Sequence, residues 1–76
     1  MDIVTGVGVI DKAMAVLRAV AVDAQSLPEL AATTGLPRAT AHRLASALEA
    51  HGLLRRDGDG RFELGHDFGD LGRLAA

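Results

Sequence analysis

The stretch SLPELAATTGLPRATAHRLASALEAHG, residues 26–52, decides the fold of this 76-residue chain. Ser26, with Glu29 three residues later, is the pattern of a capping box, which begins a short helix. Gly35 ends that helix, because glycine readily takes the left-handed conformation that closes a helix. A longer helix, which starts with a proline, is then expected over residues 37–51. A capped short helix, a glycine turn and a second helix together predict a helix-turn-helix.

The second of these helices has two different sides. At about 100° per residue, four apolar residues gather on the side that we expect to face the core: Ala41, Leu44, Ala45 and Leu48. The opposite side is small, polar and basic, and its first three turns contain no acidic residue. Because a DNA groove penalises bulk and negative charge, this side is suited to lie against DNA. The candidate DNA-binding residues on this helix are Arg38, Ala39, Thr40, His42, Arg43 and Ser46.

These candidates are expected to play different parts. Arg43 points almost directly away from the apolar side, so we expect it to bind a guanine edge or a phosphate. Arg38 lies near the start of the helix and towards its flank, where a phosphate contact is favoured over base readout. Ala39 would allow close approach to the DNA or contact a thymine methyl group. Thr40 could hydrogen-bond either a phosphate or a group in its own turn. For the charged residues the alternative is a solvent-exposed side chain.

After residue 52 the pattern changes to that of a β-hairpin, with a glycine-rich turn over residues 57–60. Three apolar side chains are expected to face inward: Leu54, Phe62 and Leu64. A hairpin directly after a helix-turn-helix is a wing. Its arginines could reach phosphates or an adjacent minor groove, although they cannot all point the same way: Arg55, Arg56 and Arg61. Ser26 is a further candidate, since the helix end that it caps can receive a phosphate.

The remaining segments are patterned less strongly. Apolar residues at helical spacing predict an amphipathic helix over residues 9–22, in which we expect Met14 to fill the core. Leu27 is expected to lend a residue or two to a small sheet. We expect a flexible N-terminus over residues 1–8. From residue 66 onward we expect a helix that needs a packing partner, because two glycines weaken it.

The distribution of charge says more than its total. The net charge of −2 would by itself argue against a nucleic-acid binder. However, residues 38–61 hold five arginines and three acidic residues, a local charge of +2, while the segments on either side each carry −2. A basic surface on one part of a domain is what phosphate contact requires.

Composition restricts the class of protein further. The chain is long enough for one small domain, and the absence of cysteine excludes disulfides and thiolate zinc sites. It has neither the pattern of a signal peptide nor an apolar run of the ~20 residues that span a bilayer. We therefore expect a cytoplasmic protein that does not enter a membrane.

No arrangement of residues predicts catalysis. His42 and Ser46 lack the third group that would make a nucleophile, base and orienting residue. His66, Asp67 and Asp70 lie near the end of the chain and make a weak metal site. We expect no enzyme activity, no cofactor and no metal.

The runs GLPRATAHRL (residues 35–44) and GLLRRDGDGRFELG (residues 52–65) resemble the N-terminal DNA-binding domain of the IclR (isocitrate lyase regulator) family of bacterial transcription factors. The resemblance implies a winged helix-turn-helix of three helices and a small hairpin, followed by a linker helix. It also implies homodimers or tetramers on palindromic or near-palindromic operators, and a C-terminal domain that senses a small-molecule effector. This sequence does not contain that effector domain, so we expect it to be part of a longer protein.

We therefore expect a mainly α fold with a small β-hairpin wing. Residues 9–65 would form a winged helix-turn-helix with a three-helix core, and residues 66–76 the start of a linker helix. The expected function is sequence-specific binding of double-stranded DNA by a bacterial transcriptional regulator, which the resemblance suggests is a repressor of a catabolic operon. The alternative is a winged-helix protein–protein interaction module that does not bind DNA.

Overall fold

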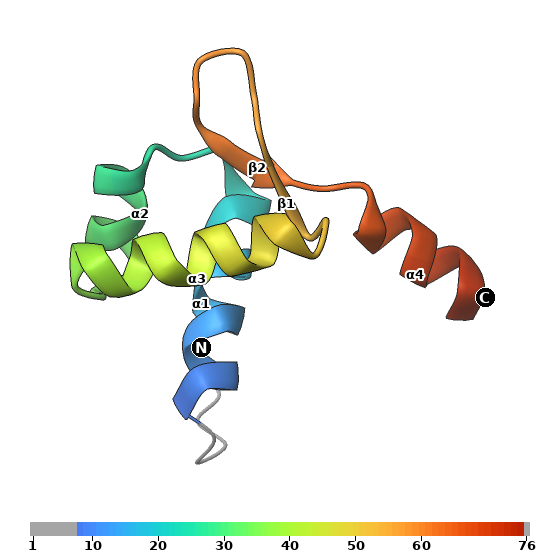
Figure 1. Ribbon diagram of the computed structural model, residues 1–76, viewed down its shortest axis with the longest axis horizontal. Helices are drawn as coiled ribbons and strands as arrows, with labels where there is room; N and C mark the ends of the chain where they lie inside the picture. Colours follow the sequence, from blue (N-terminus) through green and yellow to red (C-terminus); the bar gives the residue numbers. More distant parts are fainter. Residues whose placement is uncertain (1–7, 76) are drawn as a thin grey trace.

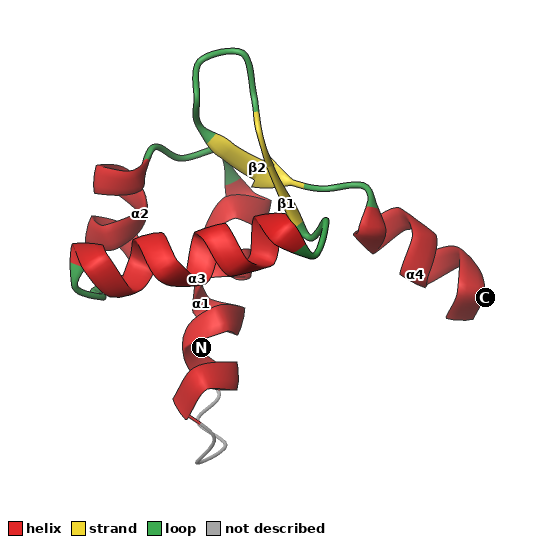
Figure 2. Cartoon of the chain, in the orientation of Figure 1, coloured by secondary structure: helices red, strands yellow, loops and turns green. Residues whose placement is uncertain are grey.

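The computed structural model describes residues 8–75 and confirms the mainly α fold with a hairpin wing (Figures 1 and 2). The elements follow in the order α1 (Gly8–Val22), α2 (Leu27–Thr34), α3 (Arg38–Ala50), β1 (Leu54–Arg56), β2 (Phe62–Leu64) and α4 (Asp67–Ala75). In Figure 1, α3 crosses in front of α1, α2 lies at one end of α3, and α4 projects away from the three-helix body. The expectation of a flexible end over residues 1–8 lies outside the described residues, except that Gly8 begins α1.

The two helices of the turn begin and end as the local sequence predicts. The Ser26 hydroxyl accepts a hydrogen bond from the Glu29 amide, and the Glu29 carboxylate accepts one from the Ser26 amide, which completes the capping box. Gly35 has φ 74°, and its amide donates to the Ala31 carbonyl at 2.9 Å. α3 begins one residue later than expected, because Pro37 has an extended ψ of 144° and is the flanking cap residue.

The core lies between α1 and the rest of the domain. The buried apolar residues of the described range come from every element except α4: Val16, Leu17, Ala19, Val20, Leu30, Ala41, Ala45, Leu54 and Phe62. Ala41 and Ala45 are completely buried, so the apolar side of α3 faces the core as expected. Their small side chains let α3 pack close to its neighbours, which offsets the small number of aromatic residues.

Two residues that were expected in the core are partly exposed. The prediction for Met14 was wrong, since it is 39% exposed. Met14 lies instead at an open hollow that it shares with Leu64 at the end of β2 and Phe68 of α4. Leu64 is 36% exposed, because it lies at the end of β2 where the chain leaves the hairpin for α4.

The wing is a short antiparallel hairpin that is tied to the chain before α2. β1 and β2 pair in the register Leu54–Leu64, Arg55–Glu63 and Arg56–Phe62. Gln25 adds a single bridge on the other side of Phe62, with hydrogen bonds of 3.0 and 2.8 Å between their main chains. This third segment was expected at Leu27, but Leu27 already lies in α2, so the extended residue is the one before the cap.

None of the helices in the described part of the chain combines the length and the apolar character needed to span a membrane.

Candidate nucleic-acid interface

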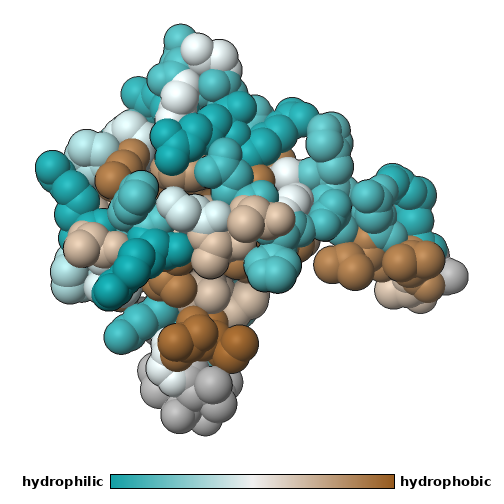
Figure 3. All heavy atoms as spheres, viewed as in Figure 1, coloured by the Kyte–Doolittle hydropathy of each residue, from teal (hydrophilic) through white to brown (hydrophobic). Residues whose placement is uncertain are grey.

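The outward side of α3 is the surface that the helix-turn-helix leaves free. Arg38, Ala39, His42 and Arg43 are exposed, while Thr40 and Ser46 are half-buried. Because α3 crosses in front of α1, this side faces the viewer in Figure 1. The same view in Figure 3 shows mainly hydrophilic residues over the wing and a mixture of hydrophilic and weakly hydrophobic residues over α3. The structure therefore leaves four of the six α3 candidates exposed and the other two half-buried.

Ala47 lies on the same side of α3, although it was not predicted as a contact residue. Ala47 is exposed and lies one turn after Arg43. Its place on the outward side follows from helical periodicity, which puts residues four apart on the same side. Ala39 and Ala47 have short side chains on either side of Arg43, so another molecule can approach the backbone of the helix closely there.

The five arginines of residues 38–61 fall into two groups. Within the described range, Arg38 and Arg43 form no ion pair with another side chain. The wing arginines each pair with a carboxylate: Arg55 with Glu63 at 3.5 Å, Arg56 with Glu49 at 3.7 Å, and Arg61 with Glu29 at 2.8 Å. The positive charge of α3 is therefore available to a ligand, whereas that of the wing is largely balanced.

The wing arginines point in different directions, as the sequence predicted they must. Arg56 lies over the ring of the buried Phe62, with its guanidinium carbon 4.5 Å from the ring centre, and covers it from solvent. Arg55 lies beside Glu63 on the partner strand, and its Nη1 is 3.0 Å from Nε2 of His66. Arg61 leaves the hairpin altogether and reaches towards the start of α2.

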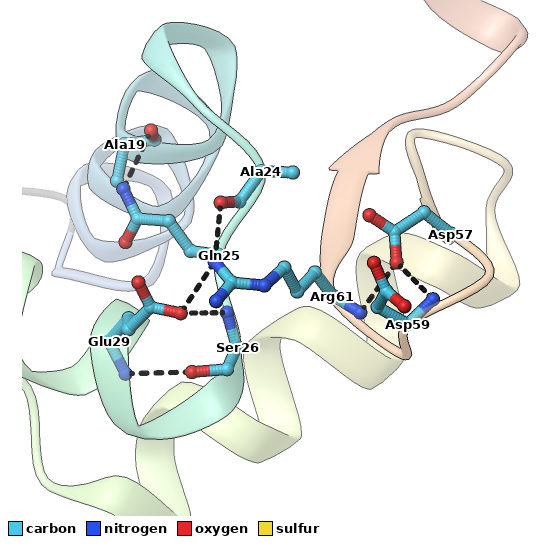
Figure 4. A network of polar contacts seen from close by, with 8 residues as sticks. All are labelled: Ala19, Ala24, Gln25, Ser26, Glu29, Asp57, Asp59 and Arg61. Atoms are coloured by element: carbon cyan, nitrogen blue, oxygen red, sulfur yellow. Dashed lines mark hydrogen bonds and ion pairs between the residues drawn. The ribbon is translucent and has the colours of Figure 1, made fainter.

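Figure 4 shows the contacts around Arg61 and the start of α2. Nη1 of Arg61 lies 2.8 Å from Oε1 of Glu29 and donates a longer hydrogen bond, 3.5 Å, to the Ala24 carbonyl. The hydrogen bond from the Ser26 amide, that from its side chain and the charge of Arg61 all lower the pKa of the Glu29 carboxyl. These groups stabilise the ionised carboxylate at the start of a helix, where the helix dipole also favours negative charge.

The tip of the wing is acidic. One carboxylate oxygen of Asp57 accepts hydrogen bonds from the amides of Asp59 and Arg61, at 2.8 and 3.0 Å, which holds the turn in shape. The Asp59 side chain is exposed at the tip. The tip thus differs in charge from the outward side of α3.

The hydroxyl of Ser26 is occupied by the cap. Because it accepts the bond from the Glu29 amide, its oxygen is committed to α2. Besides the Ser26 amide, the hydroxyl hydrogen also lowers the pKa of the Glu29 carboxyl, so Ser26 can contact a phosphate only by exchanging that carboxylate for it.

Comparisons with known proteins point to one family. Residues 9–58 match the sequence profile of a family described as the IclR helix-turn-helix domain. The chain is 43% identical over 51 residues to the HTH-type transcriptional regulator KipR of Bacillus subtilis (strain 168), a match that covers 67% of this chain and 20% of the relative.

Solved structures agree in fold over most of the chain. An IclR homolog from Microbacterium sp. strain HM58-2 is 29% identical with a TM-score of 0.79, over 87% of this chain and 29% of that one. An IclR homolog from Microbacterium hydrocarbonoxydans, complexed with 4-hydroxybenzoate, is 31% identical with a TM-score of 0.76, over 83% of this chain and 27% of that one. The chain thus spans less than a third of the length of these relatives.

Proposed function

Since this chain belongs to the IclR helix-turn-helix family, we propose that α3 enters the major groove of double-stranded DNA and that the wing lies against the backbone or the minor groove. The domain is a DNA-binding domain of a transcriptional regulator, and it is not an enzyme. The observation that carries the placement of α3 is its outward side, where two arginines are exposed and no described carboxylate pairs with them.

The α3 residues divide by position. Arg43 lies at the centre of the outward side between small residues, so its guanidinium can reach a guanine edge. Arg38 lies in the first turn, where a phosphate contact positions the helix. Ala39 lets the helix approach the bases, and three polar side chains complete the contacts to bases and backbone: Thr40, His42 and Ser46.

The wing and the start of α2 supply contacts beside the groove. Arg55 and Arg56 are exposed, and their ion pairs are of the surface kind that contributes little to stability. Arg55 can therefore exchange its carboxylate for a phosphate at small cost, and Arg56 can do so to the extent that its guanidinium stays over the Phe62 ring. Ser26 donates its hydroxyl hydrogen to a phosphate at the start of α2. Arg61 is also exposed, but its partner Glu29 is held in place by the Ser26 amide.

The DNA-bound form is a homodimer or tetramer on a palindromic or near-palindromic operator. An apolar surface supports this proposal: three residues of α4 are exposed, Phe68, Leu71 and Leu74, as are Val9, Ile10 and Met14 of α1. In Figure 3, hydrophobic residues gather along one side of α4 and over the part of α1 beyond α3, away from the α3 surface. A second copy seated on these residues would leave both recognition helices free to meet successive turns of DNA.

The chain is part of a cytoplasmic regulator with further sequence after α4. Residues 9–65 form the DNA-binding domain and residues 66–76 begin the helix that links it to a domain for a small-molecule effector. Support comes from the length of the relatives, most of which lies outside the match, and from the homolog that is complexed with 4-hydroxybenzoate. Bound at an operator, such a protein would repress a catabolic operon by occupying the DNA.

Binding of the natural full-length protein to duplex DNA, measured over a range of salt concentrations, tests the proposal. The logarithm of the affinity should fall linearly with the logarithm of the salt concentration, by about 0.9 for each phosphate neutralised. Selection of bound duplexes from a random pool should return one sequence with two related half-sites. Binding without salt dependence, or no binding, would favour a protein-interaction module instead.

A further inference from the structure

We propose that Arg61 is a positioning residue, which neutralises Glu29 and fixes the wing to the start of α2, and that it does not bind a phosphate itself. This inference rests on the proposed DNA-binding function. The wing would then have two kinds of arginine. Arg55 and Arg56 contact the DNA, whereas Arg61 contacts other residues of the protein.

The contacts of Arg61 differ from those of the other two wing arginines. Its distance to a carboxylate oxygen, 2.8 Å, is that of a charge-assisted hydrogen bond, whereas Arg55 and Arg56 lie 3.5 and 3.7 Å from theirs. It also bonds the Ala24 carbonyl, so the side chain is held at two points outside the hairpin.

The partner of Arg61 is itself fixed. Glu29 cannot turn away to free the arginine without breaking the capping box, because its Oε1 accepts both from Arg61 and from the Ser26 amide (Figure 4). The next residue of the wing, Phe62, is buried and bridged to Gln25. Side chain and main chain therefore hold Arg61 in the same place.

Glu29 is the reason that this contact matters for DNA. The N-terminus of a helix is suited to bind an anion such as a phosphate. The ionised Glu29 carboxylate lies at this end of α2, and without a partner it would repel the phosphate. Arg61 removes this repulsion by pairing with the carboxylate. Arg61 thus favours DNA binding by neutralising Glu29. Loss of Arg61 should therefore weaken DNA binding only while Glu29 is charged.

A double-mutant experiment separates the two roles. Binding of a fluorescent duplex of mixed sequence is measured for Arg61→Ala in three backgrounds of the full-length protein: wild type, Glu29→Gln and Asp59→Asn. Glutamine keeps the capping box while it removes the charge. Asp59→Asn is the matched control, because it removes an exposed acid from the same wing without touching Arg61.

We expect Arg61→Ala to weaken binding about two- to fivefold in the wild type, and by the same factor in the Asp59→Asn background. In the Glu29→Gln background the loss should disappear. The salt dependence should keep its slope throughout, since no phosphate contact is removed. Thermal melting of each variant checks folding, and Arg61→Gln replaces Arg61→Ala if the latter melts at a lower temperature than the wild type.

A direct phosphate contact would give the opposite pattern. Glu29→Gln would release Arg61 towards the DNA, so Arg61→Ala would cost more in that background, and the slope would fall by about 0.9. Either result would overturn this inference while the proposed function stands. If the wild-type protein showed no salt-dependent binding, the proposed function would fail, and this inference with it.

Discussion

Two arginines on one helix illustrate how position decides the role of a residue. Arg43 lies at the centre of the outward side of α3, and Arg38 lies in the first turn near its flank. Both are exposed, and neither pairs with a carboxylate of the described residues. Their chemistry is the same, so any difference in DNA binding must come from where the helix places them.

Replacing each arginine by alanine should separate base readout from phosphate contact. Arg43→Ala should cost about 1–3 kcal/mol on the selected operator and relax the preference for one base position. Arg38→Ala should weaken binding to all sequences alike and reduce the salt slope by about 0.9. Affinities for operator and mixed-sequence duplexes measure both. An equal loss on all sequences for Arg43→Ala would reassign it to the backbone.

The Glu29 carboxyl gives the domain a pH dependence in the acid range. Hydrogen bonds from Ser26 and the charge of Arg61 lower its pKa in the folded state. Its contribution to stability is therefore present above the ordinary glutamate pKa of 4.5 and is lost as pH falls through the lower pKa of the folded state. Glu29→Gln should remove this contribution. When the pH is lowered from 7 to below the folded pKa, the melting temperature of the wild type should fall more than that of Glu29→Gln. Equal falls in the two melting temperatures would contradict this prediction.

At the scale of elements, the joint between α3 and α4 is built from two glycines in contact. Gly52 has φ 76°, a conformation that other residues rarely adopt, and it ends the turn after α3. The Gly65 amide donates to the Leu53 carbonyl, and the Asp67 amide donates to the Gly52 carbonyl at 3.2 Å. The turn that follows the recognition helix is thus hydrogen-bonded to the start of α4.

Gly65→Ala should disrupt this joint. An added Cβ would lie 2.2 Å from the Gly52 carbonyl oxygen, so the main chain would have to move. We expect a loss of about 1–3 kcal/mol in the free energy of unfolding. Gly58→Ala is the control, since a Cβ there meets no atom within 4 Å, and its effect should stay within about 0.5 kcal/mol. Urea denaturation measures both, and similar losses for the two variants would contradict the close approach.

At the scale of the whole molecule, the polar and apolar surfaces are separated. The wing presents mainly hydrophilic residues and α3 a mixture of charged, polar and small residues, while α4 and the first half of α1 expose large apolar side chains (Figure 3). α4 contributes no buried residue among those described, although three of its side chains are large and apolar. A helix in this state gains stability when another surface covers it.

Leu71→Asp tests whether a second copy supplies that surface. Leu71 is 56% exposed, so the change should leave the folded domain intact. Because burying a leucine contributes about 1.5–3 kcal/mol, self-association should weaken by at least tenfold, and operator affinity should fall with it. Val22→Asp, at an 88% exposed site near the other end of α1, should change neither. Sedimentation equilibrium of the full-length protein measures this, and unchanged association of Leu71→Asp would exclude α4 from the interface.

Local signals in the sequence were sufficient for the helix-turn-helix. The capping box, the left-handed glycine and the apolar side of α3 are all where the sequence predicts them. Each depends on residues within about one helical turn of each other, so the chain specifies them before any tertiary contact forms. The hairpin could be predicted for the same reason, because its turn and alternating residues are adjacent in sequence.

The tertiary structure alone decided which arginines are paired and which apolar residues are covered. Arg61 meets Glu29, and Phe62 meets Gln25, only because the folded hairpin lies beside the start of α2. Met14 has the spacing of a core residue, but it lies at an open hollow beside Leu64 and Phe68 and stays partly exposed. The periodicity of a helix shows which of its sides is apolar. Whether another surface covers that side depends on the packing of elements that are distant in sequence.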